Sequence, residues 1–79
     1  MYYAYVLRSA VTGGRYIGSC EDADVRLRRH NNGDTKSTRH GTPWSLVYKE
    51  QFETRLEALR RERLLKSGQG RQFLELQGL

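Results

Sequence analysis

The sequence predicts an α+β fold in one domain, residues 1–79, with strands and helices in the order β-β-α-β-α-α. Short runs rich in aromatic and β-branched residues predict the strands, and turn residues such as Gly and Pro separate them. Helix-start signals precede the two longer helical patterns. A chain of 79 residues with 37% hydrophobic content supports one small core and leaves no room for a second domain.

Charge and composition narrow the class of partner. Fourteen Lys and Arg against nine Asp and Glu give a net charge of +5, which favours a polyanion. The one cysteine, Cys20, excludes an internal disulfide and a multi-cysteine zinc site, as is typical of a reducing cytoplasm. No apolar run is long enough to cross a membrane, and the N-terminus has no signal-peptide pattern. We therefore expect a soluble, unprocessed, cytoplasmic protein without a membrane partner.

The first two strands form a predicted hairpin. Residues 2–7 and residues 15–19 are both β-like, and a six-residue loop with a Gly-Gly pair joins them as antiparallel neighbours. This loop length places Tyr5 opposite Tyr16, and alternation puts Gly18 on the same face. Two phenols then lie beside a missing side chain. They form either an aromatic pair that stabilises the sheet or part of a site.

The next segment predicts a helix from Asp22 to Asn31. Acidic residues at its start and basic residues at its end have the charge order that the helix dipole favours. Arg26 and His30 are four residues apart and share one face, at the edge of the apolar stripe. The pair is either a solvated basic face or a charged group held at a site.

A polar loop is predicted at residues 33–43, before a third strand that begins at Trp44 and reaches Phe52. The charged residues of the loop are Lys36, Arg39 and His40. Basic and hydroxyl side chains on a mobile loop suit contacts to phosphate, although an ordinary surface loop has the same composition. Trp44 enters a strand with apolar neighbours, so we expect it to anchor the core.

The longest helical pattern runs from Thr54 to Lys66, with Thr54 as N-cap and Glu57 at the capping-box position. Glu62 falls in the arc that otherwise carries the apolar residues of this helix. A carboxylate in such a stripe is unfavourable unless it is paired or binds a metal. Glu62 is therefore either one half of an ion pair with Arg26 or a metal ligand.

A short last helix is predicted at residues 71–77, after a break at residues 67–70. Its apolar residues are expected to pack inward. These residues are Phe73, Leu74 and Leu76.

The candidate residues suit the hydrolysis of a phosphodiester. This reaction needs a deprotonated water, positive charge on the phosphate and stabilisation of the leaving oxygen. A single carboxylate can hold Mg²⁺ when water and substrate phosphate complete the shell. A tyrosine is a poor base in water, but nearby cationic or metal charge favours its phenolate.

Taken in order, several segments resemble the GIY-YIG nuclease superfamily, and most closely its small stand-alone bacterial members. The matching segments are Tyr16-Ile17-Gly18, the strand ending its motif at Tyr5, Arg26-Leu27-Arg28-Arg29-His30, Pro43-Trp44, Arg61-Glu62-Arg63 and Leu65-Lys66-Ser67-Gly68. They cover essentially the whole chain. The Tyr-Ile-Gly triplet alone is a weak signal, whereas the ordered set is specific.

The resemblance implies a three-stranded antiparallel sheet flanked by helices, with a one-metal hydrolytic site on the sheet. By this resemblance Tyr5 is the general base, and Tyr16 supports it or orients the attacking water. Arg26 stabilises the phosphate in the transition state, and His30 forms hydrogen bonds within the site and relays a proton. Glu62 binds the divalent ion, Mg²⁺ or Mn²⁺.

Two positions depart from the family pattern. The first motif reads Tyr3-Ala4-Tyr5 in place of Gly-Ile-Tyr, which keeps the tyrosine. Many members also carry a late asparagine in the site, whereas the last asparagine here is Asn32. Gln69 or Gln72 takes its place, or no residue does.

The expected activity is that of a metal-dependent DNA endonuclease, with RNA as a further substrate to test. Without an appended targeting domain, we expect single-stranded or branched DNA to be preferred, with specificity supplied by this surface or by a protein partner. The basic residues expected to bind nucleic acid are Arg15, Arg29, Lys36, Arg39 and His40. The alternative is a binding module of the same fold that has lost turnover, and a structural adaptor is a third hypothesis.

Overall fold

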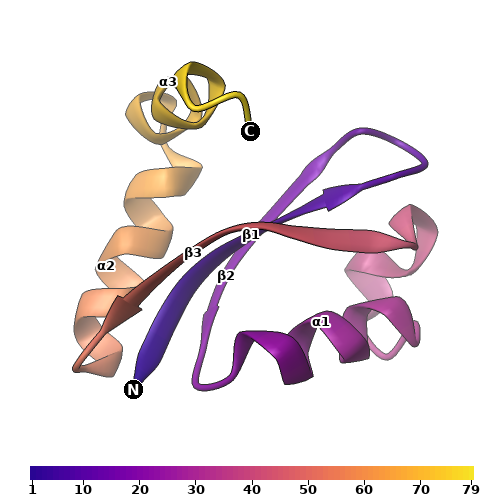
Figure 1. Cartoon of the computed structure of the whole chain (residues 1–79), viewed down its shortest axis with the longest axis horizontal. Coiled ribbons are helices and arrows are strands. Elements are labelled where there is room, and N and C mark those ends of the chain that lie inside the picture. The colour runs from indigo at the N-terminus through magenta and orange to yellow at the C-terminus, as the bar shows by residue number, and fades with distance from the viewer.

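The computed structural model describes residues 1–79 and contains three strands, three α-helices and one 3-10 helix. The elements are β1 (Tyr2–Ser9), β2 (Arg15–Cys20), α1 (Ala23–Asn31), η1 (Lys36–Gly41), β3 (Trp44–Phe52), α2 (Arg55–Lys66) and α3 (Gly68–Leu76) (Figure 1). The predicted α+β class and the order β-β-α-β-α-α are confirmed. The segment predicted as a polar loop is different, because part of it folds into η1 and buries two of its residues.

The three strands form one antiparallel sheet in the order β2-β1-β3. The predicted hairpin is confirmed, but its predicted register is wrong. Tyr5 pairs with Gly18, and Tyr16 pairs with Leu7. A shift of two residues preserves the faces, so both tyrosines still lie on the same side of the sheet.

Ser9 explains this register. Its N–H donates to the Gly14 carbonyl at 2.9 Å, which extends β1 two residues beyond the predicted end. Its hydroxyl oxygen accepts hydrogen bonds from the N–H groups of Val11 and Thr12, at 3.1 and 2.9 Å. These bonds close the turn tightly and thereby set which residues of the two strands are opposite each other.

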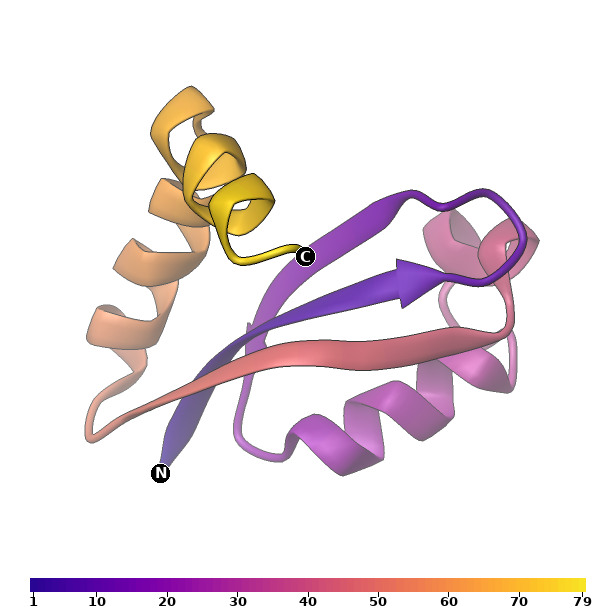
Figure 2. The same cartoon turned by 45° about the horizontal axis from the view of Figure 1, so that its top comes forward.

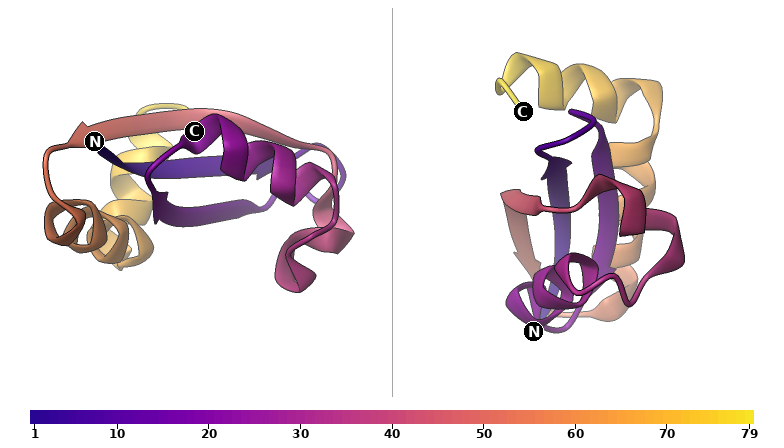
Figure 3. Two further views of the ribbon diagram at one scale, coloured as in Figure 1. Left: turned by 90° about the horizontal axis from the view of Figure 1, so that it is seen from below. Right: turned by 90° about the vertical axis from the view of Figure 1, so that its right-hand side faces the viewer.

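Alternation along β1 gives the sheet two buried faces. Ala4 and Val6 pack against Leu65 of α2 and Leu74 of α3. On the other face, one cluster contains Tyr5, Leu7 and Trp44, with Leu27 of α1 packed against it. Figure 1 shows α1 and η1 to one side of the crossing strands and α2 and α3 to the other, and the left-hand view of Figure 3 shows the same separation from below. Trp44 is 8% exposed, as expected of a core anchor.

Capping residues begin the first two helices, α1 and α2, where the sequence predicts. Asp22 caps α1 by accepting from two backbone N–H groups, and Thr54 and Glu57 form the predicted capping box of α2. The prediction for α3 is wrong at its start, because Ser67 caps a helix that already begins at Gly68.

Gly70 permits this early start of α3. A Cβ atom at this position would lie only 2.1 Å from the Leu64 carbonyl oxygen, so a glycine lets α3 approach the end of α2 closely. Phe73 and Leu74 pack inward as predicted. Leu76 does not, because it is 79% exposed.

The end of the chain returns to the hairpin. The Leu79 carbonyl oxygen accepts a hydrogen bond from Arg15 Nε at 2.7 Å and another from the Arg8 guanidinium. Figure 2 shows this end of the chain beside the sheet. None of the helices has both the length and the apolar character needed to cross a membrane.

Candidate active site

Tyr5 lies at the centre of the middle strand and is 2% exposed. Its hydroxyl oxygen lies 3.3 Å from His30 Nε2. Gly18, its partner on β2, leaves the space that the phenol occupies. A Cβ atom at position 18 would lie 2.7 Å from this hydroxyl oxygen and 2.8 Å from the adjoining ring carbon. Gly18 is therefore required by the position of the Tyr5 side chain rather than by backbone geometry.

Replacing Gly18 by Ala is expected to destabilise the fold by about 1–3 kcal/mol, because the added methyl group forces the phenol or the strand to shift. The measurement is urea unfolding of the purified variant. Gly68→Ala is the matched control, since no atom lies within 4 Å of a Cβ atom at that position. Equal stability of the two variants would contradict the close contact described above.

His30 is buried in the last turn of α1, at 1% exposure, and both of its ring nitrogens have partners. Nδ1 lies 2.8 Å from the Thr38 hydroxyl oxygen, and that hydroxyl donates to the Thr35 carbonyl at 3.2 Å. Because the Thr38 proton is used in this way, its oxygen accepts from Nδ1–H. This assignment leaves a lone pair on Nε2, which accepts the proton of the Tyr5 hydroxyl. A directed chain of hydrogen bonds thus runs from Tyr5 through His30 and Thr38 to Thr35.

Tyr16 completes an aromatic cluster around this chain. Its ring centre lies 4.6 Å from that of His30, 6.3 Å from that of Tyr5 and 6.5 Å from that of Trp44. Its side chain is half-buried, whereas that of Tyr5 is buried. Tyr16 is therefore the more accessible of the two phenols.

The surroundings keep both members of the Tyr5–His30 pair neutral. Burial raises the pKa of the Tyr5 phenol well above its usual value, and Tyr16 adds to this rise, while the Arg26 charge opposes it. Burial and the Arg26 charge lower the pKa of His30. The Arg26 charge favours the phenolate of Tyr5, as expected, but desolvation by burial is the larger effect and leaves the pKa raised.

Glu62 lies on α2, and its side chain is 18% exposed. The ion pair with Arg26, one of the two alternatives for Glu62, does not form, and Lys66 Nζ instead donates to the Glu62 carboxylate at 2.7 Å. Burial raises the pKa of Glu62, but hydrogen bonds from Lys66 and Ser19 and nearby positive charge outweigh it, so the pKa lies below its usual value. The Glu62 charge also acts on the Tyr5 phenol. The carboxylate is therefore ionised near the phenol.

The donor at this position suits a hard divalent cation. Mg²⁺ and Mn²⁺ prefer oxygen ligands, and Mg²⁺ is commonly held by one or two carboxylates plus waters and substrate phosphate. An ionised Glu62 meets this requirement. No group of three or more His, Cys, Asp or Glu side chains is placed to hold a metal ion.

Both α1 and α2 contact β2, the edge strand that carries Tyr16 and Gly18. Beside this edge, Arg26 and Arg29 of α1 line a cavity of about 310 Å³. The residues predicted to form the catalytic site are thus brought together around β2. They are Tyr5, Tyr16, Arg26, His30 and Glu62.

The residues predicted to bind nucleic acid are spread more widely. Arg29 lies beside Arg26, whereas Arg15 donates to the Leu79 carbonyl. On η1, Lys36 and His40 are exposed. Arg39, also on η1, donates to the Gly33 carbonyl at 3.0 Å.

Neither candidate for the late asparagine reaches the site. Gln69 and Gln72 line a different surface hollow, between α2 and α3.

One residue of the hydrogen-bond chain was missed, because Thr38 sits in the segment that we predicted as a surface loop. Its sequence neighbours carry no signal for burial, and only the folding of η1 against α1 places its hydroxyl on His30.

Comparisons with known proteins agree with this arrangement. Residues 1–73 match the GIY-YIG catalytic domain. A UPF0213 protein of Staphylococcus saprophyticus is 37% identical over 76 residues, which cover 95% of this chain and 92% of that one. A UPF0213 protein of Staphylococcus aureus is 36% identical over 67 residues, covering 84% and 80%.

The fold has a counterpart among solved structures. The solution NMR structure of a UPF0213 protein from Bacillus halodurans is 34% identical, with a TM-score of 0.57, over 99% of this chain and 87% of that one. The family match covers nearly the whole chain and includes every strand of the sheet. The chain belongs to the GIY-YIG catalytic domain family.

Proposed function

We propose that the protein is a metal-dependent endonuclease that hydrolyses DNA phosphodiester bonds. The observation that carries this proposal is the buried Tyr5 hydroxyl, which lies 3.3 Å from His30 Nε2 and is affected by the charges of both Arg26 and Glu62. Membership of a nuclease family supports the same reaction class. A base, a cation and an anionic oxygen donor are the groups that such hydrolysis needs.

Tyr5 acts as a general base that passes its own proton on. Because its pKa is raised, the phenol is neutral at neutral pH and has no phenolate oxygen to offer. In the proposed step, a water gives a proton to the Tyr5 oxygen while the Tyr5 hydroxyl proton moves to His30 Nε2. The water oxygen forms the new bond to phosphorus as the bond from phosphorus to the leaving sugar oxygen breaks. His30 becomes the imidazolium, and the leaving oxygen takes a proton from solvent. The acceptor is available because the lowered pKa of His30 keeps its ring neutral at neutral pH.

The remaining residues act on charge and orientation. Arg26 neutralises the phosphate as charge builds up on its oxygens. The half-buried Tyr16 orients the attacking water from the accessible side of the cluster. Glu62 would hold Mg²⁺ or Mn²⁺, and the ion would supply positive charge to the reacting phosphate.

The proposed substrate class rests on the shape of the site, which lies at one edge of a three-stranded sheet beside a cavity of about 310 Å³. Flexible single strands and branched junctions can bend toward a site of this size. We therefore propose single-stranded or branched DNA as the preferred substrate, with RNA tested alongside it and targeting by a protein partner as an additional requirement in the cell.

Wild-type protein is expected to cut labelled oligonucleotides in the presence of Mg²⁺ or Mn²⁺ and to stop when EDTA is added. The measurement is a denaturing gel with matched single-stranded, duplex and branched DNA and a single-stranded RNA. Preferential cutting of plain duplex would contradict the proposed substrate. Salt-sensitive binding without product in any lane would instead support a binding module that lacks turnover.

A further inference from the structure

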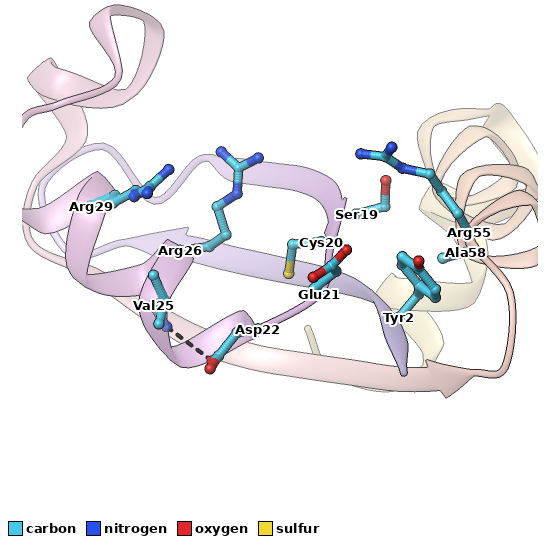
Figure 4. Close-up of a pocket in the computed structure, with 10 residues that line it drawn as sticks. All are labelled: Tyr2, Ser19, Cys20, Glu21, Asp22, Val25, Arg26, Arg29, Arg55 and Ala58. Carbon is cyan, nitrogen blue, oxygen red and sulfur yellow. Dashed lines mark hydrogen bonds between the residues drawn. The ribbon is translucent and has the colours of Figure 1, made fainter.

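A cavity of about 310 Å³ lies next to the site, between α1 and the start of α2. Arg26 and Arg29 border it from α1, and Arg55 borders it from α2. Figure 4 shows that Arg55 extends toward Ser19 from the side opposite to the two α1 arginines. Two helices therefore bring three guanidinium groups to one hollow.

These arginines have no partners within the protein. The two ion pairs of the chain are Arg61 with Glu50 and Lys66 with Glu62. The arginine side chains that donate hydrogen bonds within the protein are Arg8, Arg15, Arg39 and Arg61. The three guanidinium groups at the cavity are thus free to bind a ligand from solution.

Two carboxylates also border the cavity, but they do not neutralise it. The Asp22 carboxylate accepts hydrogen bonds from the backbone N–H groups of Asp24 and Val25 as the cap of α1. Glu21 is exposed and makes no ion pair. Three cationic side chains against two acidic ones leave a net positive hollow. An anionic ligand is favoured there, and the planar donor fork of arginine matches phosphate oxygens.

We propose that Arg29 and Arg55 bind a backbone phosphate of the substrate strand that flanks the phosphate being cut. This inference rests on the proposed function, since Arg26 belongs both to the catalytic group and to the cavity wall. A strand whose reacting phosphate lies at Arg26 continues into a hollow with two more guanidinium groups. Contacts of this kind read no base identity, so binding through the cavity is independent of sequence.

The position of Arg55 suits this role. It is the first residue of α2, immediately after the Thr54 cap, and the capping box holds this turn of the helix in place. Glu62 lies on the same helix. A strand bound to Arg55 and Arg26 is therefore positioned against both helices that supply the charged groups of the site. Arg55 is a binding residue that the sequence motifs did not indicate.

The test measures how salt weakens binding of a fluorescent oligo(dT) single strand, with EDTA present so that no cleavage occurs. The logarithm of the association constant falls linearly with the logarithm of the salt concentration. Loss of one phosphate contact on a single strand makes this negative slope less steep by about 0.7. Arg55→Gln and Arg29→Gln are each expected to show this change. The matched control is Arg60→Gln, on the same helix but away from the cavity, which is expected to keep the wild-type slope.

A second variant is expected to raise the affinity for oligo(dT) rather than lower it. Its result does not depend on whether Arg55→Gln is stably folded. Glu21→Gln removes a negative charge from the cavity wall and is expected to tighten oligo(dT) binding at low salt. The inference would be overturned if Arg55→Gln and Arg60→Gln had equal salt slopes. It would also be overturned if Glu21→Gln bound oligo(dT) no more tightly than the wild-type protein. The binding results can be interpreted even if the wild-type protein does not cleave DNA. Cleavage can in turn be observed even if the predicted changes in binding are absent. The two proposals are therefore tested separately.

Discussion

Replacing Glu62 by Gln is expected to abolish metal-dependent cleavage, with a loss on the order of 10³-fold or more in rate. The amide keeps the size of the side chain but removes the ionised oxygen that holds the metal. Glu62 is 18% exposed and its ion pair is with Lys66, whose side chain is 53% exposed. Removing such a pair changes the stability of the fold little. The measurement is the initial rate of cleavage as a function of Mg²⁺ concentration.

Glu75→Gln serves as the matched control for this experiment, because Glu75 is an exposed glutamate on α3 that makes no ion pair. It is expected to cleave at the wild-type rate. Oligonucleotide binding by Glu62→Gln in EDTA is expected to be retained or tighter, since one negative charge is removed. Undiminished cleavage by Glu62→Gln would exclude Glu62 as the metal ligand.

Replacing Tyr5 by Phe is expected to lower the cleavage rate by roughly 10²- to 10⁴-fold, the usual contribution of a general base. The variant retains the ring in its buried position on β1 but lacks the oxygen that accepts the proton of water. It also leaves His30 Nε2 without its partner, which lowers the stability by about 1–3 kcal/mol. Single-turnover rates at saturating metal, on protein shown to be folded by circular dichroism, measure the effect.

Thr38 separates proton transfer from packing in the same experiment. Thr38→Val keeps the shape of the side chain but removes the oxygen that accepts from His30 Nδ1–H, whereas Thr38→Ser retains that oxygen. We expect Thr38→Val to lose part of the activity and Thr38→Ser to keep it. Full activity of both Tyr5→Phe and Thr38→Val would contradict the relay, and Tyr16 would then be the remaining phenol that could act as base.

Local signals accounted for most of the fold. The capping box at Thr54 and Glu57 and the cap at Asp22 set where two helices begin, because these side chains act on backbone groups within one turn. The alternation around Trp44 defined the third strand in the same way. At Gly70, local sequence signals did not predict the structure. This glycine was interpreted as part of a helix break, whereas it lies inside α3, where its missing side chain lets this helix pack closely against the end of α2.

The sequence by itself determined the fold class, the family and the residue types of the site, since these depend on composition, spacing and ordered motifs. Tertiary structure decided the rest. The Tyr5–Gly18 register depends on how Ser9 closes the turn, and the neutral state of Tyr5 depends on burial by segments far away in the chain. The convergence of Arg55 on the cavity likewise requires α1 and α2 to meet at β2. Desolvation and charge act through space, so spacing along the chain does not set them.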